Sequence, residues 1–187
     1  MATLIPSLNS CLGRMTSGEK RFAYRLEKLL EDDYLCWYDV TVGVKRRRPD
    51  FLVLNPQRGL LALEVKDWKI GSIRGIDPIT IEAEFNGQIV KDVNPLLKAR
   101  DFINVTIDLL KRDPLLLQAP DSRYTGKLVM PYGHGLVLAN NASHDPNEQA
   151  RVLYVGMTRA MNRLWLTTSK DSDFAQKAQL ACTRLAA

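Results

Sequence analysis

Two short apolar runs in the middle of the chain are separated by a cluster of turn-forming residues. Residues 51–54 and 60–63 are apolar and of strand length, and residues 55–59 between them include asparagine, proline and glycine. This order predicts an antiparallel β-hairpin with a five-residue loop. Because both runs are apolar at every position, we expect the two strands to lie inside a sheet that is covered on both faces.

Charged residues stand at the open end of this hairpin. A symmetric loop places Asp50 opposite Glu64, and directly opposed residues have Cβ atoms roughly 4.5–5.5 Å apart, where like charges destabilise the pair. Lys66 projects to the same face because side chains alternate along a strand. Two carboxylates and a lysine at the end of a buried hairpin predict a metal site. Two simpler interpretations stay open: Glu64 and Lys66 form an ordinary surface ion pair, or a register slip turns Asp50 to the other face.

Other segments carry the signals of further helices and strands. Residues 16–19 fit a helix capping box and precede apolar residues at helical spacing. Asn94 followed by Pro95 is typical of a helix start, and the helix is expected to end near Arg112. The remaining expectations are an irregular arm over 1–15, a strand over 34–44, a strand pair within 71–93 that turns at Asn86 and Gly87, a loop over 114–130 and a buried strand over 132–139.

Composition narrows the class of protein without deciding its function. The 187-residue chain is 45% hydrophobic and 25% charged, as expected for a globular protein. Its net charge of +5 permits a polyanionic partner but does not require one. The three cysteines lack CxxC spacing, which argues against a disulfide framework or a zinc site. No charged leader precedes an apolar core and no apolar run approaches membrane-spanning length, so we expect a cytoplasmic protein without a membrane partner.

The charged residues also carry a family resemblance. Pro49 and Asp50, followed after thirteen residues by Glu64, Val65 and Lys66, resemble the PD-(D/E)xK nuclease signature. Over residues 16–139 the chain more narrowly resembles the nuclease-related domain called NERD. The further motifs that carry this likeness are Gly18-Glu19, Phe51-Leu52-Val53-Leu54, Gly59-Leu60, Asp67-Trp68 and Asn94-Pro95-Leu96. The resemblance implies a restriction-endonuclease-like α/β fold, a mixed central sheet flanked by helices.

The same resemblance implies an activity, Mg²⁺- or Mn²⁺-dependent hydrolysis of DNA phosphodiesters. It assigns Asp50, Glu64 and the backbone carbonyl of Val65 to the metal, which suits hard cations that prefer oxygen ligands. It gives Lys66 the role of orienting the attacking water or stabilising negative charge. Glu19 belongs to the active site in the family. By its position it is equally a helix-capping glutamate, although it also lies on the apolar stripe of its helix, where a carboxylate needs a partner.

Basic residues adjoin the predicted metal site. A run of four cations directly precedes Pro49 and consists of Lys45, Arg46, Arg47 and Arg48. Such a run is either a solvated loop or a contact surface for a nucleic-acid backbone that is bound without regard to sequence. Lys98 stands where the family often has glutamine, and a lysine at this place suits a phosphate of the nucleic acid.

The end of the chain has a second resemblance. Residues 148–160 and 163–166 resemble the last conserved motif of UvrD/Rep-like superfamily 1 helicases, where the arginine that matches Arg159 reaches the γ-phosphate of ATP. The chain has no phosphate-cradling Gly-x-x-x-x-Gly-Lys-Ser/Thr loop, so we expect no ATP binding, ATPase or helicase activity. We therefore expect a helicase remnant over 145–187, with helices near 147–161 and 173–185 and a strand near 164–168. Its apolar residues would pack on the core or on a second chain, as in a homo-oligomer.

The sequence is compatible with three functions. The first is the metal-dependent nuclease, and the second is a catalytically silent DNA-binding module derived from a NERD-containing helicase. The third is a protein-interaction remnant with no nucleic-acid role. Asp50, Glu64 and Lys66 favour the nuclease, because a binding module has no need of opposed carboxylates.

Overall fold

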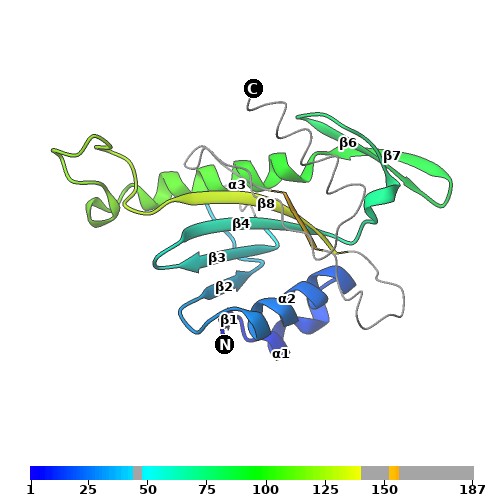
Figure 1. Cartoon of the computed structure of the whole chain (residues 1–187), viewed down its shortest axis with the longest axis horizontal. Helices are drawn as coiled ribbons and strands as arrows, with labels where there is room; N and C mark the ends of the chain where they lie inside the picture. The colour runs from blue at the N-terminus through cyan, green and yellow to red at the C-terminus, as the bar shows by residue number, and fades with distance from the viewer. Residues whose placement is uncertain (44–47, 140–151, 156–187) are drawn as a thin grey trace, which may run out of the picture.

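The computed structural model describes residues 1–43 and 48–139, and the backbone of residues 152–155. Two sheets form this part of the chain, a six-stranded mixed sheet and a smaller antiparallel sheet of three strands. Helices flank the larger sheet, so the predicted mixed α/β architecture is confirmed (Figure 1). None of the described helices combines the length and apolarity needed to cross a membrane.

The six-stranded sheet has the strand order β1-β2-β3-β4-β8-β9. β1 pairs in parallel with β2 and β4 pairs in parallel with β8, whereas the other neighbours are antiparallel. The strands are β1 (Thr3–Ile5), β2 (Leu35–Tyr38), β3 (Phe51–Asn55), β4 (Gly59–Lys66), β8 (Tyr132–Ala139) and β9 (Val152–Val155). β3 and β4 therefore lie at the centre of the sheet, as predicted.

The central hairpin has the predicted register. Leu54 pairs with Leu60 and Phe51 pairs with Leu63. The ladder continues through Asn55 and Gly59, so the connection is two residues shorter than the predicted loop. Gly59 has a positive φ of 91°, and a Cβ there would collide with the carbonyl oxygen of Pro131. Glycine is therefore required at this position, where the start of β4 meets the segment that leads into β8.

Two hydrophobic clusters cover the two faces of this sheet. On one face, α2 (Ser17–Leu29) contributes Phe22, Ala23 and Leu26 to a cluster that also contains Leu63 and Val65 of β4. On the other face, α3 (Pro95–Leu110) packs Phe102, Ile103 and Ile107 against residues that include Leu52, Leu60 and Ala62. Alternate residues of β3 and β4 thus enter different clusters. This two-sided burial explains why both strands are apolar at nearly every position.

Both predicted helix starts are present. Thr16 caps α2 in a full capping box with Glu19, and the side chain of Asn94 accepts a hydrogen bond from the backbone N–H of Leu96 at the start of α3. The predicted loop over 114–130 holds only a short 3₁₀ turn, η3 (Pro114–Leu116), and one isolated bridge.

The smaller sheet consists of β5 (Ile73–Ile76), β6 (Thr80–Phe85) and β7 (Gln88–Val93), and follows the short turn η2 (Ile70–Ser72). The predicted strand pair is confirmed as β6 and β7, with β5 as an additional strand. Their turn has positive φ at both Asn86 (51°) and Gly87 (79°), as a two-residue hairpin turn requires. Every residue of β7 is exposed, in contrast to the central strands.

Three expectations need correction. Residues 1–15 are not an irregular arm, because they contain β1, α1 (Leu8–Cys11) and η1 (Leu12–Arg14). The strand expected over 34–44 is limited to Leu35–Tyr38, because Asp39 leaves the extended conformation with a φ of 52°. The helix expected over 147–161 is wrong at Val152–Val155, which pair with β8 as a strand, in keeping with two valines and a tyrosine. The rest of the expected helix-strand-helix appendage lies outside the described residues.

Candidate active site

The open end of the β3–β4 hairpin brings the predicted site residues onto one face of the sheet. Asp50 directly precedes Phe51, which pairs with Leu63, so the same register sets Asp50 opposite Glu64. Residues two positions along each strand, Leu52 and Ala62, pack in the cluster beside α3. Asp50, Glu64 and Lys66 therefore face the side of the sheet that α3 covers, and the register slip considered above does not occur.

These three residues are tied together by short contacts. The backbone N–H of Val65 donates to Asp50 Oδ2 at 2.6 Å. Lys66 Nζ lies 2.7 Å from Glu64 Oε1, and the two side chains are only 23% and 10% exposed. The glutamate and lysine do form an ion pair, but it is largely buried and is not the surface pair considered above. Removing one partner of such a pair would leave the other charge without compensation.

Burial and mutual repulsion change the protonation of this group. The pKa of Asp50 is raised to about 7, first because burial disfavours the charged carboxylate and then because Glu64 is negative. The hydrogen bond from Val65 and the positive charge of Lys66 offset only part of this rise. Burial alone would lower the pKa of Lys66, yet the hydrogen bond with Glu64 and the neighbouring carboxylates raise it overall. Lys66 therefore stays protonated at neutral pH, whereas Asp50 titrates near neutral pH.

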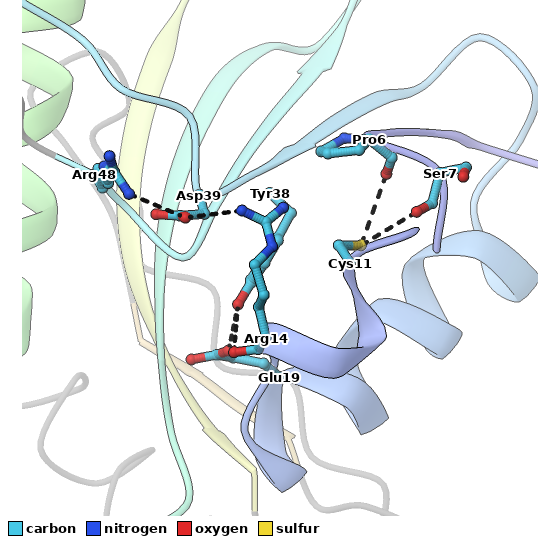
Figure 2. Close-up of polar contacts among 8 residues, drawn as sticks. All are labelled: Pro6, Ser7, Cys11, Arg14, Glu19, Tyr38, Asp39 and Arg48. Carbon is cyan, nitrogen blue, oxygen red and sulfur yellow. Dashed lines mark hydrogen bonds and ion pairs between the residues drawn. The ribbon is translucent and has the colours of Figure 1, made fainter. Parts of the chain in front are cut away.

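Glu19 lies on α2, at the other face of the sheet, and fulfils its capping role there. Its Oε2 accepts a hydrogen bond from the backbone N–H of Thr16 at 3.0 Å. The same oxygen accepts one from the hydroxyl of Tyr38 at 2.9 Å (Figure 2). The side chain is buried, and its negative charge contributes to the raised pKa of Asp50. The partner that an inward-pointing carboxylate needs is thus Tyr38.

Tyr38 was not singled out from the sequence. It is the last residue of β2 and pairs with Phe51, so it stands beside the strand that Asp50 begins. Burial and the hydrogen bond to Glu19 raise the pKa of its hydroxyl, which stays protonated as the donor. Its position in a strand next to the Pro-Asp motif is the only sequence signal that could have indicated it.

Close packing at the start of α2 fixes Glu19 near the ends of β4 and β8. A Cβ on Gly18 would lie 3.1 Å from the Cβ of Ala139 and 3.3 Å from that of Asp67, so a larger residue would push the helix away. One turn later, Arg21 Nη2 binds Asp67 Oδ1 at 2.5 Å and the carbonyl oxygen of Ala139 at 3.0 Å. Gly18 and Arg21 together hold the helix against the strand ends that carry the site.

Of the predicted basic residues, the structure describes Arg48 and Lys98. Arg48 is exposed and forms an ion pair with Asp39 at 3.3 Å. Lys98 is exposed on α3. The other cations of the run, Lys45, Arg46 and Arg47, lie outside the described residues.

A family model described as the nuclease-related domain, NERD, matches residues 14–131, well over half of the chain. The chain belongs to the NERD family. The match contains the whole β3–β4 hairpin and α2, and it ends before the segment in which the helicase resemblance lies. No curated protein and no solved structure matches the chain.

The donor set of this NERD domain suits a hard divalent cation. Asp50 and Glu64 supply two carboxylates, and Val65 between Glu64 and Lys66 supplies a backbone carbonyl as a candidate third ligand. Burial first and the negative charge of Glu64 second raise the pKa of Asp50, and a bound cation would favour its charged form. Within the described ranges, no group of three or more histidine, cysteine, aspartate or glutamate side chains is arranged to hold a metal. A metal here would therefore depend on the carboxylate pair, main-chain oxygen and water.

Proposed function

We propose that this NERD domain is a divalent-metal-dependent nuclease that hydrolyses DNA phosphodiesters. The observation that supports it best is the group of buried Glu64 and half-buried Asp50 and Lys66 at one end of the hairpin, in a chain of a nuclease-related family. Burying two opposed carboxylates beside a lysine costs stability. A function that needs concentrated negative charge explains why the fold accepts that cost.

Each residue has a role in this proposal. Asp50, Glu64 and the carbonyl of Val65 hold Mg²⁺ or Mn²⁺, which when bound supplies an activated water and offsets charge on the phosphate. Lys66, kept protonated by its neighbouring carboxylates, orients that water or stabilises negative charge on a phosphate oxygen. Glu19, fixed by Thr16 and Tyr38, is an auxiliary acceptor for water at the same site.

Metal binding is the direct test. Mg²⁺ or Mn²⁺ should raise the melting temperature of the wild type, because the ion binds the folded state and relieves repulsion between the carboxylates. Asp50→Ala should remove this increase. Glu84→Ala is a matched control, because Glu84 is a strand glutamate paired with Arg74 in the smaller sheet, away from the carboxylate pair. Calorimetry that detects no binding at millimolar metal would overturn the proposal.

A catalytically silent DNA-binding module is the second candidate. It is favoured by the internal pairing of the site, because Asp50 accepts a hydrogen bond from the Val65 backbone and Glu64 accepts one from Lys66, so each carboxylate already has a partner within the protein. A silent module would bind DNA yet fail to cleave it in Mg²⁺ or Mn²⁺, whereas the nuclease would do both.

We also propose that residues 145–187 derive from a superfamily 1 helicase and no longer handle nucleotide. The motif around Arg159 supports the proposed origin of this segment in a helicase. The lack of a phosphate-cradling loop in the sequence supports the loss, because an arginine of this kind cannot form a nucleotide site alone.

A further inference from the structure

Two arginines from separate segments converge on one carboxylate beside the candidate site. Arg14 Nη1 lies 3.7 Å and Arg48 Nη1 lies 3.3 Å from the same oxygen, Oδ2 of Asp39 (Figure 2). Both arginine side chains are more than half exposed, at 58% and 53%. Two guanidinium groups therefore face solvent with one carboxylate between them.

The backbone links this arginine pair to the catalytic strand. The N–H of Asp39 donates to the carbonyl oxygen of Asp50 at 3.1 Å, and Arg48 lies two residues before Asp50 in the chain. Asp39 has a positive φ of 52°, which is uncommon for a residue other than glycine. This conformation ends β2 at the point where its last residue, Tyr38, binds Glu19. The pair of arginines is therefore fixed to the same strand ends as the acidic residues.

Arg14 is held in place by more than its ion pair. The centre of its guanidinium lies 5.9 Å from the centroid of the Tyr38 ring, and the Tyr38 hydroxyl lies 3.4 Å from the Arg14 carbonyl oxygen. Tyr38 thus contacts Arg14 with its ring and Glu19 with its hydroxyl. One side chain connects the acidic site to the basic pair.

The charges of this group do not cancel. A guanidinium carries five N–H donors, and a single carboxylate shared by two arginines satisfies few of them. The remaining donors and the surplus positive charge suit an oxygen-rich anion of the size of a phosphate. A carboxylate that already sits between the two guanidiniums marks the place where such an anion would bind.

We propose that Arg14 and Arg48 bind a phosphate of the nucleic-acid backbone next to the one cleaved, and that Asp39 is the internal anion that this phosphate partly displaces. The proposal rests on the proposed function for the nature of its ligand. It assigns Arg14 a positioning role, which the sequence did not suggest. It also explains why an aspartate with a strained backbone stands where two arginines need a counter-ion.

DNA binding in EDTA tests this directly, because no cleavage occurs without metal. Fluorescence anisotropy with a labelled duplex should show that Arg14→Gln and Arg48→Gln each weaken binding about fivefold to tenfold. Each should also reduce the slope of log affinity against log salt by about 0.9. Asp39→Asn should instead tighten binding, because it removes the competing anion. Asparagine tolerates the left-handed backbone at this position, so this variant should fold.

Arg58→Gln is the matched control. Arg58 is also an exposed arginine with its guanidinium 5.9 Å from a tyrosine ring, that of Tyr34, but it lies in the β3–β4 turn at the opposite end of the hairpin. Its loss should leave affinity and salt slope unchanged. Arg14→Lys keeps the charge, so it should preserve the salt slope and will show whether a defect in Arg14→Gln reflects charge or folding.

Three results would overturn the inference. They are unchanged binding in both arginine variants, weaker binding in Asp39→Asn, and no detectable DNA binding by the wild type. Unchanged binding together with a lower melting temperature would show that the cluster serves only the fold. Cleavage measured separately with Mn²⁺ decides the nuclease proposal, so the two proposals can fail independently.

Discussion

The two sheets of this domain contain the same kind of ion pair in different surroundings. In β4, Lys66 and Glu64 lie 2.7 Å apart with side chains 23% and 10% exposed. In the smaller sheet, Lys91 and Glu82 lie 3.1 Å apart with side chains 60% and 42% exposed. An exposed pair of this kind contributes about 0–1 kcal/mol to stability and is weakened by salt. The buried pair costs desolvation. Beside it, burial of Asp50 and then the negative charge of Glu64 raise the pKa of Asp50, while Lys66 lowers it.

This difference distinguishes ion pairs that only link strands from charged residues that are suited to catalysis. In the smaller sheet, Arg74–Glu84 and Lys91–Glu82 link neighbouring strands at the surface. In the central sheet, the charged residues are surrounded by apolar clusters and affect one another's protonation. The contact distance therefore does not distinguish the candidate site from a surface ion pair, whereas burial together with a second carboxylate does.

The largest expected effect is on cleavage. Lys66→Ala should lower the rate of DNA hydrolysis by about 100-fold or more, because it removes a preorganised cation at the site. Lys91→Ala, which breaks an ion pair in the smaller sheet, should leave the rate within about twofold of wild type. A gel assay with Mn²⁺ and a labelled duplex measures both. Cleavage that survives Lys66→Ala undiminished would point to a different active site.

The next effect is on stability, through one phenylalanine in each sheet. Phe51 is fully buried and contacts Phe22 edge-on with ring centroids 5.2 Å apart, so Phe51→Ala should cost about 3–5 kcal/mol. Phe85 is 36% exposed and contacts Trp68, so Phe85→Ala should cost about 1 kcal/mol. Urea unfolding measures both values. Equal losses would show that the smaller sheet is as essential to folding as the central one.

A smaller effect is the pH dependence of stability without metal. The native pKa of Asp50, about 7, is above its ordinary value of 3.8, so the folded state binds the proton more tightly than the unfolded state. The resulting stabilisation is present at low pH and is lost as pH rises from about 4 to about 7. Its size is on the order of 2–4 kcal/mol. Asp50→Asn should remove this slope in urea unfolding measured in EDTA.

The pKa of Asp77, next to β6 of the smaller sheet, is shifted in the opposite direction. Hydrogen bonds from the Thr80 side chain, and then from the Thr80 and Ile79 backbone, lower its pKa to about 2. The stability that ionised Asp77 contributes is present above its ordinary pKa of 3.8 and is lost as pH falls towards 2. Asp77→Asn should therefore change stability only in acid.

A pH profile of Asp50→Asn that matches the wild type between pH 4 and 7 would contradict the proposed origin of the slope.

The sequence predicted those parts of the fold that depend on neighbouring residues. The turn before Gly59, the Asn86–Gly87 turn and the caps at Thr16 and Asn94 each use local backbone chemistry, and each occurs where it was expected. It failed for β1 and β9, which are short strands that pair with β2 and β8. Three or four residues carry too little periodicity to indicate a strand.

The sequence by itself determined the hairpin, its register and the opposition of Asp50 and Glu64, because an apolar pattern and a turn fix which side chains share a face. Only the tertiary structure decided what surrounds that pair. It buried the Glu64–Lys66 ion pair, placed the Tyr38 hydroxyl on Glu19, and brought Arg14 and Arg48 to Asp39. The Tyr38–Glu19 and Arg14–Asp39 contacts join separate segments, and the strength of the Glu64–Lys66 pair depends on exclusion of water by the whole fold, which local sequence does not encode.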